Sequence, residues 1–120
     1  MDELARHFWE GCAERQLRFQ RCEDCDRAQY YPRPFCSVCG SHRLHWEVSA
    51  GCGTLYSGAE IIRSPSPEFE TLVPYTMALI DLDEGVRMMG HANPVLGIGE
   101  RVTATFREHC GRFLPYFEPE

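Results

Sequence analysis

The sequence predicts a mainly β protein, in which an N-terminal helix and a four-cysteine zinc ribbon precede a small closed barrel. Two Cys-x-x-Cys pairs lie near the start of the chain, and an amphipathic segment comes before them. In the second half, short runs of alternating apolar and polar residues are separated by turns with glycine and proline, a pattern typical of small β barrels. We therefore expect residues 1–48 to form the helix and ribbon, and residues 49–120 to form the barrel.

The charge of the chain argues against a nucleic-acid partner. Its 120 residues carry 12 basic and 18 acidic side chains, which is a formal net charge of −6. Proteins that bind phosphate backbones need clustered Lys and Arg, and the arginines here form no run. We expect the five arginines between residues 15 and 33 to lie on a solvated face: Arg15, Arg18, Arg21, Arg27 and Arg33.

The sequence predicts neither a membrane span nor a secretory signal. No apolar run approaches the length that crosses a bilayer. The first residues are acidic at once and lack the cationic, apolar and small-residue order of a signal peptide. We therefore expect the protein to be cytoplasmic.

The N-terminal helix is expected over residues 2–16, where Leu4, Phe8 and Cys12 recur on one helical face. So short a helix is marginal alone in water and gains its stability by packing. Packing against the rest of the chain is the usual outcome for the bulky neighbours Phe8 and Trp9. The alternative is that Phe8 and Trp9 contact a partner protein.

The two cysteine pairs, Cys22 with Cys25 and Cys36 with Cys39, predict one metal centre. Two residues between thiols allow a tight knuckle to aim both sulfur atoms at one point, and two knuckles complete a tetrahedron. Zinc suits four thiolates, although an iron centre of the rubredoxin type has the same ligands. Four protein ligands leave no open position for substrate, so we expect one structural zinc. A disulfide framework would need an oxidising compartment.

The barrel is predicted from five short strands, over residues 53–62, 75–82, 86–92, 100–106 and 113–119. Five strands with glycines at the corners favour an OB-like closed barrel. Gly51 and Gly53 mark a bend where the ribbon meets the barrel. The loop over residues 63–74 contains three prolines and is too long for a plain hairpin turn. Loops of this length in compact domains are often functional.

In combination, these segments resemble the domain-of-unknown-function 35 family. The resemblance is carried by "FWEG", "LRFQRCEDC", "YPRPFCSVCG" and "GCGTLYS", then by "PYTMALIDLDEGVRMMG" and "GIGERVTATF". It extends from about Phe8 to Pro119 and implies a rubredoxin-like zinc ribbon joined to an OB-fold. Two positions depart from the family. Cys52 replaces a basic or polar residue, and Asp26 replaces a glycine after the first cysteine pair, where aspartate tolerates a left-handed turn.

The resemblance implies an accessory subunit of an acyl-CoA-processing complex, in lipid or aromatic acid metabolism, that is not catalytic alone. A thiolase or acyltransferase partner in a hetero-oligomer is expected first. A hotdog-fold enoyl-CoA hydratase or an acyl-CoA aldolase is the alternative partner. The OB domain would lie over the partner's active-site entrance and share the CoA ester with it. A nucleic-acid-binding OB-fold is the alternative of another class.

The same resemblance gives the long loop a role beside the CoA ester. The candidate acyl-CoA contacts are Arg63, Phe69, Leu72 and Tyr75. Arg63 could pair with a CoA phosphate, an interaction for which the arginine fork is well suited.

A self-contained enzyme is the rival interpretation. It would use Cys52 as nucleophile, His91 or His109 as base, and Asp81 to orient the base. Nothing in the sequence brings these residues within hydrogen-bond reach, and such constellations are recognised by their geometry.

Overall fold

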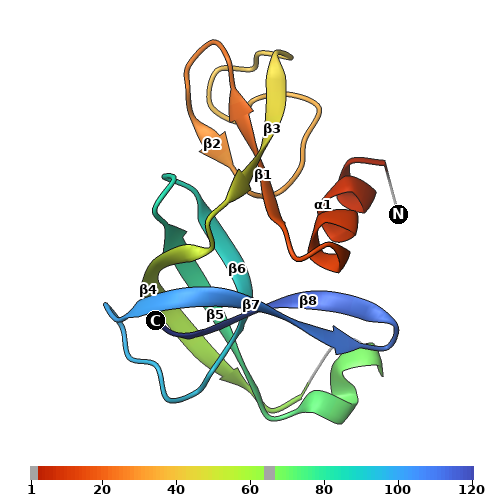
Figure 1. Cartoon of the computed structure of the whole chain (residues 1–120), viewed down its shortest axis with the longest axis vertical. Coiled ribbons are helices and arrows are strands. Elements are labelled where there is room, and N and C mark those ends of the chain that lie inside the picture. Colours follow the sequence, from red (N-terminus) through yellow and green to blue (C-terminus); the bar gives the residue numbers. More distant parts are fainter. Residues whose placement is uncertain (1–2, 64–66) are drawn as a thin grey trace.

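A computed structural model describes residues 3–63 and 67–120, and it separates a ribbon at one end from a barrel at the other (Figure 1). The helix α1 (Glu3–Ala13) lies beside the ribbon and contacts both the ribbon and the barrel strand β8 (Arg112–Pro119). The chain measures 41 × 32 × 24 Å along its principal axes. Of the helices in these ranges, none is long and apolar enough to span a membrane.

Helix α1 is shorter than expected, because it ends in a tight hydrogen-bonded turn. Gln16 N donates to Gly11 O at 2.7 Å and Arg15 N donates to Cys12 O at 3.1 Å, the bond pattern of a Schellman cap. Arg15 has a φ of 61°, in the left-handed region where glycine is usual. An arginine in this position gives no sequence signal for a helix end. The expected face is buried at Phe8 and Cys12, and burial raises the pKa of the Cys12 thiol to about 12.

The ribbon is a three-stranded antiparallel sheet in the order β2-β1-β3, made of β1 (Leu17–Cys22), β2 (Ala28–Gln29) and β3 (Leu44–Ser49). Leu17 and Phe19 are buried, as the alternation predicts. Gln20 is buried as well, and its amide is satisfied. Its Nε2 donates to Arg33 O at 3.0 Å, and its Oε1 accepts from Arg33 N at 3.0 Å. These bonds tie the segment between the cysteine pairs to the sheet.

The expectation that the five arginines between residues 15 and 33 lie on a solvated face is wrong for Arg18 and Arg21. Their side chains are only 14% and 20% exposed. Arg18 lies under α1 and donates from Nη1 to His7 O at 3.1 Å. A Cβ on Gly11 would lie 2.6 Å from Cδ of Arg18, so the glycine makes room for this side chain. Arg18 therefore holds the helix against the ribbon.

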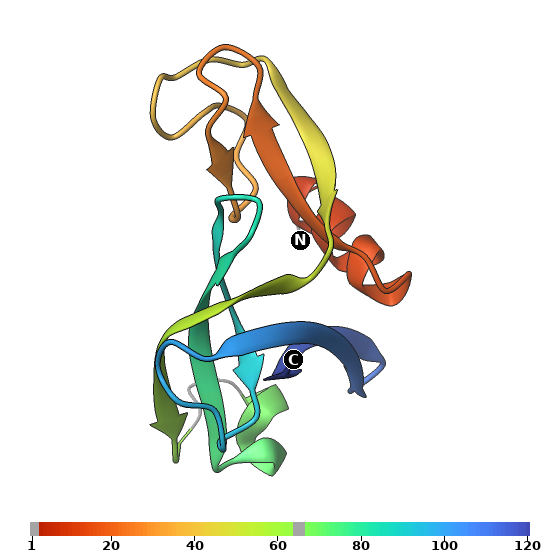
Figure 2. The same cartoon turned by 60° about the vertical axis from the view of Figure 1, so that its left-hand side comes forward.

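The barrel has the five expected strands and is closed, in the order β4-β5-β6-β8-β7 (Figure 2). Its strands are β4 (Cys52–Ile61), β5 (Tyr75–Leu82), β6 (Arg87–Ala92), β7 (Arg101–His109) and β8. All pairings are antiparallel except that of β6 with β8, which is parallel. The core side chains of the barrel include Leu55, Ile80, Met88, Val102 and Phe117.

Two glycines shape the start of the barrel, as expected. Gly51 has a φ of 84° and turns the chain from β3 into β4. Gly53 lies so close to β5 that a Cβ would be 2.5 Å from the carbonyl oxygen of Asp81. The sequence therefore permits both a bend and a close strand contact at this junction.

Part of the predicted long loop is helical. Pro67–Leu72 forms the 3-10 helix η1, at the end of the barrel far from the ribbon (Figure 1). Proline is favourable in the first turn of a helix because its missing N–H would be unpaired there in any case. The loop therefore places Leu72 and Tyr75 at the barrel end.

Candidate metal centre and end cavity

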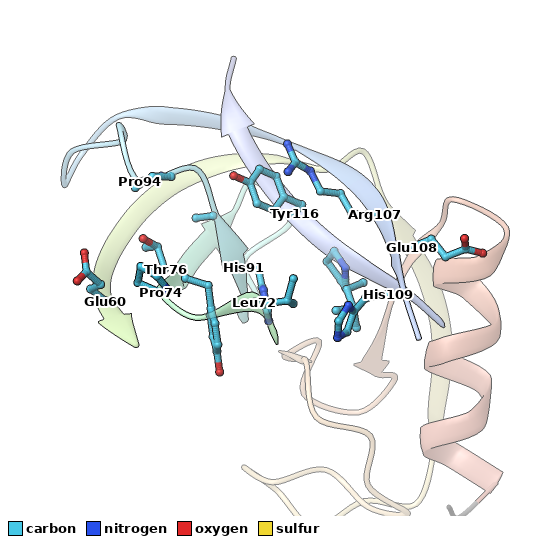
Figure 3. Close-up of a pocket in the computed structure, with 14 residues that line it drawn as sticks. Glu60, Leu72, Pro74, Thr76, His91, Pro94, Arg107, Glu108, His109 and Tyr116 are labelled. Atoms are coloured by element: carbon cyan, nitrogen blue, oxygen red, sulfur yellow. The ribbon is translucent and has the colours of Figure 1, made fainter. Parts of the chain in front are cut away.

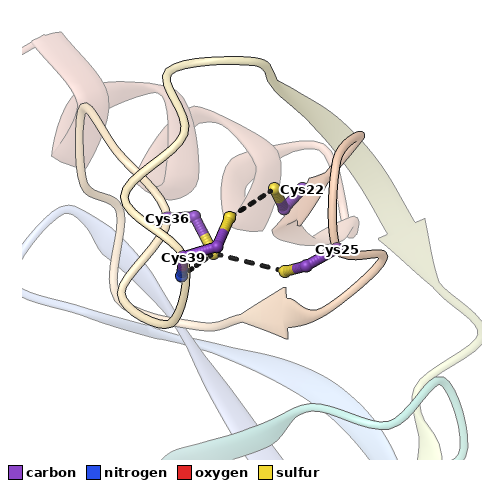
Figure 4. A group of neighbouring side chains, drawn as sticks. All are labelled: Cys22, Cys25, Cys36 and Cys39. Atoms are coloured by element: carbon purple, nitrogen blue, oxygen red, sulfur yellow. Dashed lines mark hydrogen bonds between the residues drawn. The ribbon is translucent and has the colours of Figure 1, made fainter.

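The four cysteines of the two pairs converge on one point in the ribbon, as predicted (Figure 4). All four Sγ atoms lie within 4.8 Å of one another, and the Cys22–Cys39 and Cys25–Cys36 Sγ atoms are 3.6 Å apart. A tetrahedron with zinc–sulfur bonds of ~2.3 Å has edges of ~3.8 Å. The cluster therefore has the size and the donor set of a closed zinc site.

Backbone geometry prepares the cluster for a metal. Asp26 and Gly40 follow the two pairs with φ of 63° and 79°, so aspartate does adopt the left-handed turn that the knuckle needs. Val38 N and Cys39 N point at Cys36 Sγ at 3.4 and 3.5 Å. The backbone N–H groups of Cys39 and Val38 lower the pKa of the Cys36 thiol to about 6. They stabilise the thiolate, which is the form that binds zinc.

A second feature, which we call the end cavity, lies between η1 and the strands β5, β6, β7 and β8 (Figure 3). It has a volume of about 470 Å³. Its lining includes Leu72, Tyr75, His91, Arg107 and Tyr116. Cavities of a few hundred Å³ with mixed apolar and polar walls are typical of small-molecule sites.

Two ring contacts build the walls of the end cavity. Tyr75 and His91 are stacked, with centroids 4.7 Å apart and planes inclined by 3°. Burial lowers the pKa of His91, and the nearby His109 lowers it further, so both causes favour the neutral imidazole. On another wall, the Arg107 guanidinium lies 3.6 Å from the ring centroid of Tyr116. The cavity thus offers flat rings and a neutral imidazole.

The structure brings together two of the four candidate acyl-CoA contacts. Leu72 and Tyr75 line the end cavity, whereas Arg63 is exposed and is not part of its lining. Phe69 belongs to η1, but its side chain lies outside the part of the chain that the structure describes. The role of all four in ligand binding stays a prediction.

Sequence reasoning missed the residues that β6 and β8 contribute to the end cavity. His91 lies opposite Tyr116 in the parallel pair of β6 with β8. Alternation within each strand could have shown that both side chains face outward. The closure that makes them neighbours is not a local property of either strand.

The prediction that Phe8 contacts a partner needs correction. Phe8 is 3% exposed and packs edge-on against Trp9 and Tyr30, at centroid distances of 5.1 and 5.5 Å. The apolar face of α1 therefore packs against other parts of the same chain. Trp9 is half-buried, with the Arg112 guanidinium 5.2 Å from its ring centroid. Trp9 keeps a partly open surface, so its contact with a partner stays a prediction.

The rival catalytic constellation is not assembled. Cys52 pairs with Thr103 on β7, and His109 is six residues farther along that strand, or ~20 Å at ~3.4 Å per residue. His91 lies opposite Met77 on β5, at the other end of the barrel from Cys52. The Asp81 carboxylate accepts two hydrogen bonds from Arg87, at 2.7 and 3.2 Å. Distance thus separates the nucleophile from both proposed bases.

The closed cysteine site and the five-stranded barrel together define a protein of the zinc-ribbon and OB-fold class. Residues 9–45 match the family model described as the ChsH2 rubredoxin-like zinc ribbon domain. Residues 46–107 match the model described as the ChsH2 C-terminal OB-fold domain. The chain belongs to this ChsH2 family, whose relatives include proteins named for DUF35, so the resemblance seen in the sequence is confirmed.

Curated relatives carry names from acyl-CoA metabolism. The chain is 36% identical over 118 residues to a probable enoyl-CoA hydratase alpha subunit of Thermomonospora curvata, covering 93% of this chain and 36% of the relative. It is 34% identical to the 3-oxo-4,17-pregnadiene-20-carboxyl-CoA hydratase alpha subunit of Mycobacterium tuberculosis, covering 94% and 37%. The chain thus spans little more than a third of these two proteins. A DUF35 domain-containing scaffold protein of Methanocaldococcus jannaschii is 30% identical, with 88% and 79% covered.

Solved structures agree with the fold. A chain of the "Ltp2-ChsH2(DUF35) aldolase" has a TM-score of 0.82 and 31% identity, covering 99% of this chain and 96% of that one. A DUF35 protein of unknown function from Sulfolobus solfataricus has a TM-score of 0.66 at 13% identity, covering 100% and 87%, and so supports the fold alone.

Proposed function

We propose that this chain is a non-catalytic, zinc-stabilised accessory component of an acyl-CoA-processing complex, and that its partner is a hydratase or an aldolase. The observation that carries the proposal is the likeness to a chain of the Ltp2-ChsH2(DUF35) aldolase, over nearly the whole of both chains. The hydratase alpha subunits among the relatives support the same assignment. The thiolase partner expected first gains no support from these relatives, so it moves behind the other two.

The geometry of the chain favours an accessory role over self-contained catalysis. The metal site has four protein ligands and no open position, so its contribution is to the folding of the ribbon. Cys52 lies far from both histidines that could activate it. The partner would supply the nucleophile and the acid–base groups of the reaction.

Within this proposal, the CoA ester lies at the end of the barrel near η1. The end cavity is large enough for part of such a ligand, and Leu72 and Tyr75 form its η1 side. The exposed Arg63 precedes η1 and can reach a CoA phosphate outside the cavity. The cavity would enclose the acyl end of the ester while the nucleotide stays in solvent or on the partner.

The experiment is co-expression of this chain with hydratase or aldolase genes from its own genome, followed by affinity purification and acyl-CoA turnover assays. We expect stable co-purification, and activity that requires both chains. Tyr75→Ala is expected to leave the complex intact and to raise KM for the acyl-CoA about tenfold, because it removes one cavity wall. Tyr31→Ala, in an exposed ribbon position, is the matched control and should change neither.

The proposal fails if the partner is fully active alone, or if this chain remains a monomer beside every candidate enzyme. If Tyr31→Ala also raised KM about tenfold, the effect would come from tyrosine removal in general and not from a ligand contact.

A further inference from the structure

A second cavity adjoins the end cavity and has no role in the proposal so far. It has a volume of about 200 Å³ and lies where α1, the ribbon and the barrel meet. We call it the helix cavity. His91, Leu114 and Pro115 line both cavities. The two spaces therefore adjoin one another and have three lining residues in common.

The position of His91 between the two cavities follows from strand alternation. On β6, Met88 and Gly90 face the core, so Met89 and His91 face outward. His91 lies opposite Met77 on β5 and opposite Tyr116 on β8. The outer face of β5, β6 and β8 thus runs from η1, at the end cavity, to α1, at the helix cavity.

The lining of the helix cavity is apolar. It consists of Phe8, Trp9, Tyr30, Met77, Met89, Gly90, Leu114 and Pro115, together with His91 and Arg112. Among these described residues none is acidic, and the one guanidinium lies over the ring of Trp9. Methionine side chains adapt to irregular apolar ligands. Such walls favour hydrocarbon and offer little to a phosphate.

The volume of the helix cavity indicates whether it holds a separate ligand or the end of a ligand that also occupies the end cavity. The helix cavity, at about 200 Å³, is smaller than the ~300 Å³ at which small-molecule pockets begin. It is also too small for a partner's helix, which is ~10 Å across. A chain of methylene groups that continues from the end cavity past His91 is narrow enough to fit, and it needs no separate pocket of its own.

We propose that the two cavities form one acyl groove, which receives the apolar acyl chain of a medium- or long-chain CoA ester. The thioester would lie near Leu72 and Tyr75, and the end of the chain would lie between Met89 and Trp9. His91 stands between the two halves, and its stacking on Tyr75 holds its ring in place. This inference rests on the proposed function, and it adds the class of acyl group.

The test is a calorimetric titration of the zinc-loaded chain with butanoyl-, octanoyl- and decanoyl-CoA, each below its micelle concentration, and with CoA alone. We expect affinity to rise with acyl length. The upper limit is about fourfold for each added methylene, which corresponds to ~0.8 kcal/mol per buried CH₂ group. Octanoic acid is the arm for a free fatty acid, and it is expected to bind more weakly than octanoyl-CoA.

Met89→Trp fills the helix cavity from an exposed strand position, where Met89 is 47% exposed. It is expected to leave butanoyl-CoA binding unchanged and to remove the gain between butanoyl- and decanoyl-CoA. Val48→Trp is the matched control, since Val48 is 54% exposed on β3 and lines neither cavity. The control should keep the full dependence on chain length.

The inference is overturned if the wild-type chain binds all esters equally or binds none, or if Met89→Trp keeps the dependence on chain length. Octanoic acid binding as tightly as octanoyl-CoA would assign the groove to free fatty acids instead. These outcomes are independent of partner assembly. Length-dependent binding by a chain that never co-purifies with an enzyme would support the groove and contradict the accessory role.

Discussion

Glu84 holds Ser49 at the point where the ribbon becomes the barrel. Ser49 Oγ donates to Glu84 Oε1 at 2.7 Å, and Ala50 N donates to Oε2 at 2.8 Å. From the ribbon, Arg21 Nη2 donates to the carbonyl oxygen of Glu84 at 3.0 Å. Glu84 belongs to the turn between β5 and β6, so one turn of the barrel fastens the last residues of the ribbon sheet.

Removal of the Glu84 side chain should destabilise the junction between the ribbon and the barrel. Glu84→Ala leaves Ser49 and Ala50 without their acceptor, and we expect the free energy of unfolding to fall by about 1–2 kcal/mol. Urea denaturation measures the loss, and hydrogen exchange at Ala50 and Gly51 locates it. Glu10→Ala, at an exposed position of α1, is the control and should change stability by less than about 0.5 kcal/mol. Equal stability of the two variants would contradict a stabilising role for the Glu84 hydrogen bonds.

The zinc site predicts a sharp difference between two cysteine variants. Elemental analysis of the native protein should find about one zinc per chain. Cys36→Ser is expected to lose the metal and unfold the ribbon, because the binding energy of a structural zinc is folding energy. Cys110→Ser, exposed and outside the cluster, should keep the full zinc content. Iron in place of zinc, or a folded ribbon in Cys36→Ser, would contradict the assignment.

Two glycines of the same strand should respond in opposite ways to alanine. A Cβ on Gly53 would lie 2.5 Å from Asp81 O, a backbone atom that cannot move without distorting β5. We expect Gly53→Ala to cost about 2 kcal/mol or more. A Cβ on Gly58 would have no neighbour closer than 3.7 Å, so Gly58→Ala should be neutral or stabilising by up to ~1 kcal/mol. Urea unfolding of both variants tests the contrast, and similar losses would refute it.

The pKa of His91 should lie below its usual value of 6.5. Burial disfavours the imidazolium, and the charge of His109 disfavours it further. His109→Asn should raise this pKa without restoring it fully, since burial is the larger cause. The pH dependence of the His91 imidazole resonances in NMR spectra measures this pKa. A value at or above 6.5 would contradict the burial of the ring.

The lowered pKa of His91 also makes the free energy of unfolding depend on pH. The folded chain binds a proton at His91 more weakly than the unfolded chain does. His91 therefore lowers the free energy of unfolding as pH falls through and below about 6.5. Well above pH 6.5 both states are neutral and the residue contributes no pH dependence.

Nucleic acid should not bind in a salt-sensitive manner. OB-folds that bind oligonucleotides use the face of their second and third strands, which here are β5 and β6. Next to α1 that face carries Met77, Met89 and His91, and its Arg87 is paired with the Asp81 carboxylate. Fluorescence anisotropy with single-stranded DNA and RNA is expected to show no complex near physiological ionic strength. A micromolar complex that weakens as salt is added would revive the nucleic-acid alternative.

The metal centre and the barrel strands follow from short stretches of sequence. Each Cys-x-x-Cys knuckle closes within a few residues, so the spacing of Cys22, Cys25, Cys36 and Cys39 carries the geometry of the site. The signals for the strands are equally local, because the alternation of apolar and polar residues and the flanking turn residues lie within or next to each strand. β5 begins at Tyr75 and ends at Leu82, as predicted.

Which outward-facing side chains meet depends on how the whole chain folds. His91 reaches Tyr116 through the closure of the barrel, and Ser49 reaches Glu84 across 35 residues. The burial of Phe8 and the partial burial of Arg18 followed from the docking of α1, which depends on the whole surface beneath the helix. A residue's own neighbours in sequence set its backbone preference and its face. They do not set what that face will pack against, and both cavities are made from such long-range contacts.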